Sequence, residues 1–298
     1  MHKQEEVATE EVLRISHEAN GRSVCRRREE RVVREAEVRL RIFKGGKKKG
    51  EFCVFCMPSL LEELALGFLR CEGFLSSASA DALPPLKVRK KVRKSETKGG
   101  GSEGKLEGLL PSYEIGIDLG EGEREENVKE KGRVWKERGV SGVARKEEEE
   151  EEGESNSSVA VAAEEVLEFS RKLNESGRLF RATGGTHVVG VFGSSRREIF
   201  VEDVSRHCAI DKAVGLCLKM GIPTEESVLV TSCRQTYSTM RKAVNAGFKV
   251  VVSVSAPTKE AVDIARSFGI TLIGFAREGR FNVYANAWRV VGAEGRGE

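Results

Sequence analysis

The sequence predicts an α/β fold: a C-terminal sheet covered by helices, a smaller N-terminal α+β region, and a charged insertion between them. From residue 159 onward, short apolar runs alternate with segments of helical periodicity, a pattern typical of helix-covered sheets. Valine runs such as Val250–Val252 suit strands that are buried on both faces. Residues 87–158, by contrast, are dominated by Lys, Glu and Gly. The 298 residues therefore divide into regions 1–86, 87–158 and 159–298.

The composition restricts the partners and the compartment. Hydrophobic residues make up 39% of the chain, enough for a packed core, and the net charge of +3 is too small to indicate nucleic-acid binding. No apolar run is long enough to span a membrane, and Met1–Glu6 carries no apolar signal region. We therefore expect a cytoplasmic protein. Its seven cysteines, an odd number, do not favour a disulfide framework.

The N-terminal region, residues 1–86, predicts a hairpin followed by one helix. Strands are expected over Glu37–Phe43 and Glu51–Cys56, joined by a turn at Gly45–Gly46. Pro58 and Ser59 then open a helix that ends near residue 73. Its apolar stripe consists of Leu60, Leu61, Leu64, Ala65 and Phe68.

Residues 87–158 predict a flexible insertion. They include six consecutive glutamates, Glu147–Glu152, among many Lys and Gly residues. A stretch of this kind buries little apolar surface, so it gains too little to offset the entropy of ordering.

The last region predicts alternating helices and strands. Helices are expected over 160–173, 202–220, 237–246 and 259–268, and the last three end at glycines. Strands are expected over 186–192, 227–231, 249–255, 270–275 and 281–285.

Polar residues cluster where these strands meet loops, and ligands of open α/β sheets bind beyond the carboxyl ends of strands. The segments concerned are 183–187 with His187, 202–212, 231–236 and 255–258. Each has a structural alternative: a packed histidine for His187, a solvated stripe on the helix, and helix capping by Ser232 or Thr236.

Two of these segments suggest specific chemistry. Helical spacing would place Asp203, His207 and Asp211 on one face with Arg206 beside them, and a neighbouring carboxylate would raise the pKa of His207. Further along, Arg277 and Arg280 flank a glycine in a loop that could clamp a phosphate. No phosphate-binding P-loop, dinucleotide motif or metal-ligand motif occurs, so no metal site is expected.

Taken in order, these segments resemble the FdhD family, the formate dehydrogenase accessory sulfurtransferases. The resemblance rests on Thr183-Gly184-Gly185-Thr186-His187, on Glu202 through His207 with Asp211-Lys212, on Thr231-Ser232-Cys233-Arg234, on Ser255-Ala256-Pro257-Thr258, on Gly274-Phe275 through Tyr284, and on Met57-Pro58 with Leu61 through Gly73. It covers roughly residues 35–75 and 180–285.

The resemblance implies a cytidine-deaminase-like α/β domain in a homodimer. Such proteins take sulfur from a cysteine desulfurase as a persulfide and pass it to the molybdenum bis(molybdopterin guanine dinucleotide) cofactor before its insertion into formate dehydrogenase. The family's cofactor-binding stretch, where a GDP-like guanine nucleotide would bind, falls on Phe275, Ala276, Arg277, Glu278, Gly279 and Arg280. Further candidates for the same site are His187, Arg206, His207 and Arg234.

The chain departs from this family at the catalytic cysteine pair. Ser141 and Ala144 occupy the two cysteine positions, and no cysteine lies between Cys71 and Cys208. Of the remaining thiols, Cys233 has the best physical case, because a helix start and Arg234 would lower its pKa. Cys208 beside His207 is a second candidate.

Cys53 and Cys56 have the spacing of a cysteine pair, but on a strand they face opposite sides and suit small buried side chains. Three functions therefore stay open from the sequence. They are sulfur transfer, a non-catalytic chaperone for the guanine-dinucleotide cofactor, and a nucleotide-modifying hydrolase using His207 and Asp211.

Overall fold

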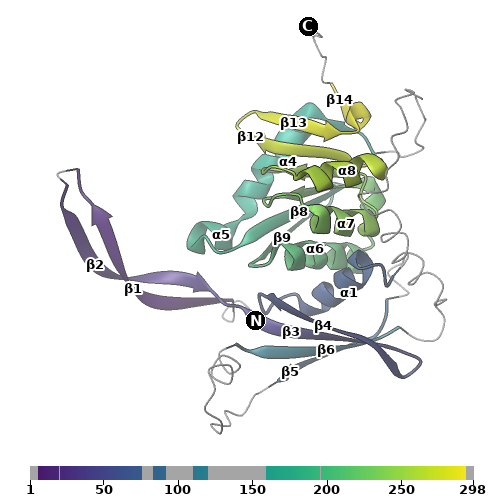
Figure 1. The fold of residues 1–298 in the computed structure, drawn as a ribbon, viewed down its shortest axis with the longest axis horizontal. Helices are drawn as coiled ribbons and strands as arrows, with labels where there is room; N and C mark the ends of the chain where they lie inside the picture. The colour runs from purple at the N-terminus through teal and green to yellow at the C-terminus, as the bar shows by residue number, and fades with distance from the viewer. Residues whose placement is uncertain are drawn as a thin grey trace.

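The computed structural model describes residues 6–19, 21–75, 83–91, 110–119, 159–194 and 196–292. These form a six-stranded and a four-stranded sheet with helices packed between them, and two smaller two-stranded sheets (Figure 1). The larger sheet has the strand order β13-β12-β11-β10-β8-β9. Strands β10, β11 and β12 run parallel, while β8, β9 and β13 are antiparallel to their neighbours. The strands are β8 His187–Gly193, β9 Glu198–Asp203, β10 Ser227–Thr231, β11 Val250–Ser253, β12 Thr271–Arg277 and β13 Arg280–Ala285.

Helices cover both faces of this sheet. Helices α6 Arg206–Met220, α7 Tyr237–Ala246 and α8 Lys259–Ser267 pack on one face, and α4 Ala163–Ser176 packs on the other. Val251 belongs to the first core, whereas Val250 and Val252 belong to the second. The valine run is therefore buried on both faces, as its sequence predicts. Short elements complete this half: α5 Arg178–Thr183, the helical turns η2 Thr224–Glu226 and η3 Ala287–Arg289, and the paired strands β7 Val161–Ala162 and β14 Val290–Val291.

The smaller sheet has the order β4-β3-β6-β5, with β3 Ala36–Lys44, β4 Lys47–Cys56, β5 Leu86–Lys91 and β6 Ser112–Asp118. Alternate residues of β3 are buried beneath helix α1 Leu61–Cys71, and the opposite face carries ion pairs such as Arg41 with Glu51. This alternation is what a sheet with one solvated face requires.

Strands β5 and β6 correct the expectation that 87–158 is a flexible insertion. Strand β6 runs parallel to β3 at the centre of the sheet, and its Tyr113, Ile115 and Ile117 are buried. These three residues supply apolar surface to the core. The prediction missed them because it rested on the average composition of residues 87–158. Residues 92–109 and 120–158, with Ser141, Ala144 and the glutamate run, lie outside the described residues.

Helix α1 joins the two sheets by crossing α6 at close range. A Cβ atom on Gly67 would lie 1.6 Å from the carbonyl oxygen of Asp211, and one on Gly215 would lie 1.9 Å from that of Glu63. Glycine at both positions therefore allows backbone to touch backbone.

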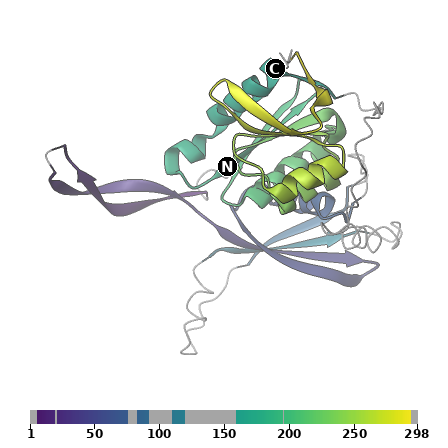
Figure 2. The ribbon, with the colours of Figure 1, turned by 45° about the horizontal axis from the view of Figure 1, so that its top comes forward.

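The sequence did not predict the hairpin before residue 35 or the strand before α6. Residues 7–33 form a long hairpin, β1 Val7–His17 and β2 Ser23–Val33, which projects from the body in both ribbon views (Figures 1 and 2). Residues 198–203, of which 202 and 203 were expected in a helix, form strand β9 instead, and α6 begins only at Arg206, capped by Ser205.

The mixed α/β class is confirmed, while the cytidine-deaminase-like likeness and the domain boundaries stay predictions. None of the helices in the described part of the chain combines the length and apolar character needed to cross a bilayer.

We expect Ile115→Ala to destabilise the protein strongly, because Ile115 is fully buried at the centre of the smaller sheet. The loss should be about 2–5 kcal/mol, the usual range for large-to-small substitutions in a core. Urea unfolding followed by circular dichroism measures it. Val88→Ala, at a position exposed on β5 of the same sheet, should change stability by less than about 0.5 kcal/mol. Equal stability of the two variants would mean that β6 is not part of the folded core.

Candidate functional site

Most of the predicted site residues meet at one edge of the larger sheet. The parallel strands β10, β11 and β12 end there, β8 begins there and β9 ends there. Asp203 is the register partner of His187, and Thr231 is that of Ser253. The antiparallel β8–β9 pair therefore brings His187 to the carboxyl ends of the parallel strands, the edge where open α/β sheets bind ligands.

The loop that carries Cys233 is held by buried hydrogen bonds. The carbonyl oxygen of Cys233 accepts from Ser253 Oγ at 2.8 Å and from Thr231 Oγ1 at 3.2 Å. Gln235 Nε2 donates to Thr231 Oγ1 at 2.6 Å, and Val188 N donates to Ser232 Oγ at 2.9 Å. Ser232 thus ties the loop to β8 and does not cap α7, whose N-cap is Thr236. These bonds hold the loop closed against the sheet edge.

The environment of Cys233 corrects the expectation of a lowered thiol pKa. Cys233 is only 4% exposed, and burial raises its pKa. The Thr231 hydrogen bond and the charges of Arg206 and Arg234 act in the opposite direction but do not overcome burial. The nucleophilic thiolate is therefore disfavoured while the site is closed.

Arg206 is a half-buried cation at this edge. Its Nε is buried without a hydrogen-bond partner among the described residues, and so is Oε1 of Gln235. The charge of Arg206 adds to the lowering of the His187 pKa and opposes the rise in the Cys233 pKa, so its guanidinium acts electrostatically on both groups. Arg234, in contrast, is exposed. The edge thus offers an unused donor and an unused acceptor beside the thiol, both typical of a ligand site.

His207 corrects a second expectation. Its pKa is lowered to about 4, chiefly by burial and then by the charges of Lys242 and Arg206. The carboxylate expected to raise this pKa, Asp211, already binds Lys242 Nζ through both oxygens, at 2.8 and 3.0 Å. An imidazole that stays neutral and a carboxylate held by a lysine give no support to a hydrolase that uses this pair.

Asp203 is separated from the predicted helical face because it ends strand β9. It forms a fully buried ion pair with Lys212, 2.5 Å between Nζ and Oδ2, and Lys212 also donates to the carbonyl oxygen of Met57 at 2.9 Å. Asp203 in turn accepts from the backbone N–H groups of Met57 and Ser205. The group is a structural link between the sheet edge and the segment before α1.

Sequence reasoning did not identify Lys242 and Glu72. Lys242 Nζ lies 2.9 Å from Glu72 Oε1 as well as bonding Asp211, and Arg241 pairs with the same glutamate. Glu72 comes from the end of α1 and Lys242 from α7, so no local pattern could have connected them. This network fixes the first turns of α6 against α1 and α7.

The predicted arginine loop is a tight hairpin turn between β12 and β13. Arg277 and Arg280 are register partners, and Glu278 and Gly279 form the turn with φ of 54° and 75°. Both arginines are exposed, and in the described part of the chain neither has a carboxylate partner. Like charges directly opposite each other on a hairpin repel. A bound anion would relieve that repulsion.

The turn is anchored to the same sheet edge. Phe275 N donates to the carbonyl oxygen of Ser255 at 3.1 Å, and Ser255 Oγ donates to that of Ser232 at 3.3 Å. A Cβ atom on Gly274 would meet Pro257, Ser255 and Tyr284 within 3.2 Å, so glycine allows these segments to approach. Ala276, by contrast, is fully buried in the core between the larger sheet and α4.

Of the other cysteines, Cys25 and Cys53 are exposed and lie on β2 and β4, outside the larger sheet, whereas Cys56, Cys71, Cys208 and Cys217 are buried. The expectation of a buried side chain is confirmed for Cys56 and wrong for Cys53, which points to the exposed face of β4. Burial raises the pKa of Cys217 to about 12. Cys208 Sγ donates to the carbonyl oxygen of Phe55 at 3.7 Å. Among the described residues, no group of three or more His, Cys, Asp or Glu side chains is arranged to hold a metal ion.

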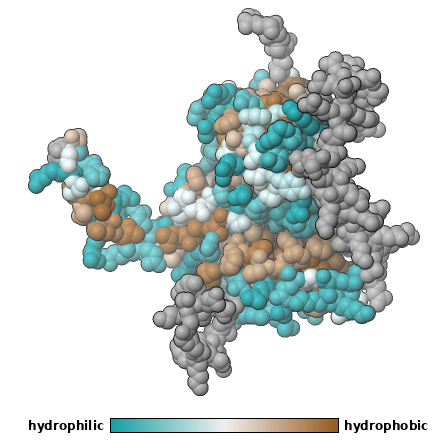
Figure 3. All heavy atoms as spheres, in the orientation of Figure 1, coloured by the Kyte–Doolittle hydropathy of each residue, from teal (hydrophilic) through white to brown (hydrophobic). Residues whose placement is uncertain are grey.

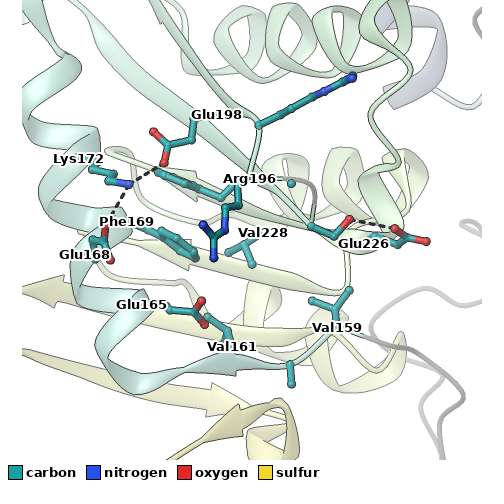
Figure 4. A pocket seen from close by; sticks show the side chains of 15 residues that line it. Val159, Val161, Glu165, Glu168, Phe169, Lys172, Arg196, Glu198, Glu226 and Val228 are labelled. Carbon is teal, nitrogen blue, oxygen red and sulfur yellow. Dashed lines mark hydrogen bonds and ion pairs between the residues drawn. The ribbon is translucent and has the colours of Figure 1, made fainter.

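Two pockets lie near the larger sheet. One, of about 590 Å³, is at the base of the β1–β2 hairpin and includes Gly185 and Val204, which adjoin the site edge. The other, of about 530 Å³, is at the opposite edge beneath α4 (Figure 4). There Lys172 binds Glu198 and Glu168, and Ser194 binds Glu226. No predicted site residue lines this second pocket, so it is separate from the candidate site.

Comparison with known proteins gives one consistent result. The model of the FdhD/NarQ family matches residues 35–291. A sulfur carrier protein FdhD of Methanothermobacter thermautotrophicus is 30% identical over 266 residues, which is 89% of this chain and 94% of the relative. A protein of the same name from Thermoplasma acidophilum is 39% identical over 132 residues, 44% of this chain and 47% of that one.

A solved structure shows the same fold. The chain superposes on the crystal structure of a protein described as a formate dehydrogenase accessory protein, from Desulfotalea psychrophila, with a TM-score of 0.62 at 20% identity. The match covers 95% of this chain and 99% of that chain.

The lowered pKa of His207 predicts how stability depends on pH. The unfolded chain binds a proton on this histidine near pH 6.5, whereas the folded chain resists it until about pH 4. Stability should therefore fall as the pH is lowered from 6.5 towards 4. We expect His207→Gln to reduce that fall, as measured by urea unfolding at pH 7 and pH 5. His17→Gln, on the exposed hairpin, is the control, and an unchanged profile for His207→Gln would exclude this contribution.

Proposed function

Because the chain belongs to the FdhD/NarQ family, we propose that it is a sulfur carrier for the maturation of formate dehydrogenase. The observation that carries the proposal is the position of Cys233. This thiol lies at the carboxyl edge of the larger sheet, close to Arg206 and Arg234 and joined through Ser232 and Ser255 to the arginine hairpin.

The proposed sulfur source is a cysteine desulfurase that carries a persulfide. The Cys233 thiolate would attack the outer sulfur of that persulfide, and the desulfurase cysteine would leave as a thiolate. Cys233 would then hold the transferred sulfur as its own persulfide. Arg206 and Arg234 would stabilise the anionic sulfur in both steps. Because Cys233 is 4% exposed, the Thr231–Gln235 loop has to open for the attack.

The proposed acceptor is the molybdenum bis(molybdopterin guanine dinucleotide) cofactor, bound as substrate before it enters formate dehydrogenase. Its diphosphate and guanine ends would bind the Phe275–Arg280 hairpin, where Arg277 and Arg280 stand opposite each other without a carboxylate partner in the described chain. A homodimer in the cytoplasm completes this proposal.

A second function is favoured by two observations. Burial raises the pKa of Cys233, and no cysteine lies between Cys71 and Cys208. A chaperone that binds the guanine-dinucleotide cofactor without moving sulfur needs the arginines and needs no thiolate.

Persulfide loading separates the two functions. We expect the intact protein, incubated with a cysteine desulfurase and free cysteine, to gain the mass of one sulfur atom on Cys233. Cys233→Ser should abolish the gain because it removes the thiol at the site, while Cys217→Ser should retain it because that thiol lies inside α6. Mass spectrometry of the intact protein and its peptides measures both.

The other outcomes are equally informative. Loading on a different cysteine would show that Cys233 is not the carrier. No loading on any cysteine would exclude sulfur transfer and leave the chaperone function.

Nucleotide binding tests the arginine hairpin independently of sulfur. We expect the double variant Arg277→Ala/Arg280→Ala to bind GDP more weakly, by about 1.5–3 kcal/mol for each charged hydrogen bond lost. Isothermal titration calorimetry measures the affinity. Arg266→Ala is the matched control, since Arg266 is an exposed arginine in the last turn of α8, away from the site edge. Equal affinities of the double variant and the control would remove the hairpin from the site.

A further inference from the structure

The β1–β2 hairpin, here called the arm, is a two-stranded ribbon with exposed apolar side chains. Its strands of 11 residues each pair along their whole length. Leu13 and Ile15 are each 59% exposed, and Val32 is 37% exposed. Figure 3 shows brown, hydrophobic surface along the arm, and Val32 lies at its base, where it lines a pocket with Gly185 and Val204. An isolated two-stranded hairpin is at best marginally stable in water, so the arm calls for a partner.

The outer edge of β1 is the surface where that partner can bind. Arg34 N donates to the carbonyl oxygen of Glu6, which makes the even-numbered residues of β1 the hydrogen-bonded partners of β2. The odd-numbered residues, among them Glu11, Leu13 and Ile15, therefore direct their N–H and C=O groups to the outer edge. The base of β2 contacts α5, whereas among the described elements only β2 pairs with β1.

We propose that the β1 edges of two copies of this chain pair antiparallel about a two-fold axis at Val12. The homodimer belongs to the proposed function, on which this inference rests, and the arm as its interface goes beyond it, because the proposed function gives the arm no role. In this register Glu10 lies opposite Arg14 of the partner subunit, and the same ion pair forms again by symmetry. Arg14 also binds Glu30 within its own arm, so each Arg14 would lie between two carboxylates. Thr9 lies opposite Ile15 of the partner subunit. Both are odd-numbered residues, whose N–H and C=O groups point to the outer edge of β1, so they can form backbone hydrogen bonds with each other.

Charge complementarity favours this register over the two alternatives in which the two-fold axis lies one residue away, at Glu11 or at Leu13. Moving the axis to Glu11 would place the two Glu11 side chains opposite each other, and like charges in that position are destabilising. Moving it to Leu13 would place Val12 opposite Arg14 and lose the Glu10 ion pairs. With the axis at Val12, the two valines face each other in a non-hydrogen-bonded pair, where side chains come closest.

The pairing also covers apolar surface. Leu13 gains Leu13 of the partner subunit as its diagonal neighbour, and such neighbours are within reach of long side chains. The two arms together form one four-stranded sheet. Independent stability needs three or more strands, which one hairpin does not supply. The dimer thus supplies what the isolated arm lacks.

Cross-linking tests the register. In a Cys25→Ser/Cys53→Ser background, which removes the two exposed thiols, Val12→Cys should form an intermolecular disulfide under mild oxidation by a small-molecule disulfide. The two Val12 Cα atoms would be about 4.5 Å apart in a non-hydrogen-bonded pair, within disulfide range. Glu10→Cys is the matched control, since its two copies would be offset by four residues, roughly 13 Å. Equal cross-linking of both variants would overturn the register.

Charge reversal tests the interface itself. In sedimentation equilibrium, the wild type should dimerise, and Glu10→Arg and Arg14→Glu should each weaken the dimer by roughly tenfold or more, because two ion pairs become two repulsions. The double variant Glu10→Arg/Arg14→Glu should recover most of the affinity. A monomeric wild type, or a dimer insensitive to these charges, would overturn the proposal. No desulfurase, sulfur or nucleotide is present, so failure here leaves the sulfur-carrier function standing.

Discussion

The close crossing of α1 and α6 is the constraint on which the rest of the structure depends. Gly67 and Gly215 let the two helix backbones touch, since a Cβ at either position would overlap a carbonyl oxygen of the other helix. One face of α1 belongs to the core of the smaller sheet, and α6 belongs to the core of the larger one. The crossing therefore sets the distance between two sheets that share no strand. A larger side chain at either glycine would separate the cores and move the start of α6.

Buried ion pairs fix how α6 and α7 are positioned relative to the N-terminal region. Lys212 is fully buried yet paired with Asp203 and with the Met57 carbonyl, and Lys242 is bonded to Asp211 and Glu72. A buried charge is costly alone, and removing one partner of such a pair is strongly destabilising. Through the Met57 carbonyl and Glu72, these lysines connect α6 and α7 to the N-terminal region. A shift of one element relative to the other would therefore leave a buried charge without its partner. The result is that Arg206 and His207, in the first turn of α6, are held at the carboxyl edge of the larger sheet.

The sheet edge produced by this arrangement carries arginines and is held by hydrogen bonds, and its thiol, Cys233, is disfavoured as a thiolate. Hydroxyl groups of Thr231 and Ser253 hold the Cys233 carbonyl, and Arg206 keeps a buried Nε without a partner in the described chain. Burial of Cys233 outweighs the charges of the nearby arginines, so the closed edge disfavours the free thiolate. The arginine hairpin beyond the edge is exposed, so its two arginines and the buried Cys233 lie at different depths.

The sequence by itself determined most elements of the larger sheet and the segments of its site. Apolar periodicity gave the strand at 227–231 and the helix at 237–246 without error, because each is encoded within a few neighbouring residues. It missed β6, whose three buried residues lie within a charged stretch, and β9, whose start precedes the predicted helix. Only the tertiary structure decided which charges pair and whether Cys233 is reactive. Glu72 and Lys242 are neighbours solely through packing, and a thiol pKa depends on burial, which adjacent residues in the chain do not encode.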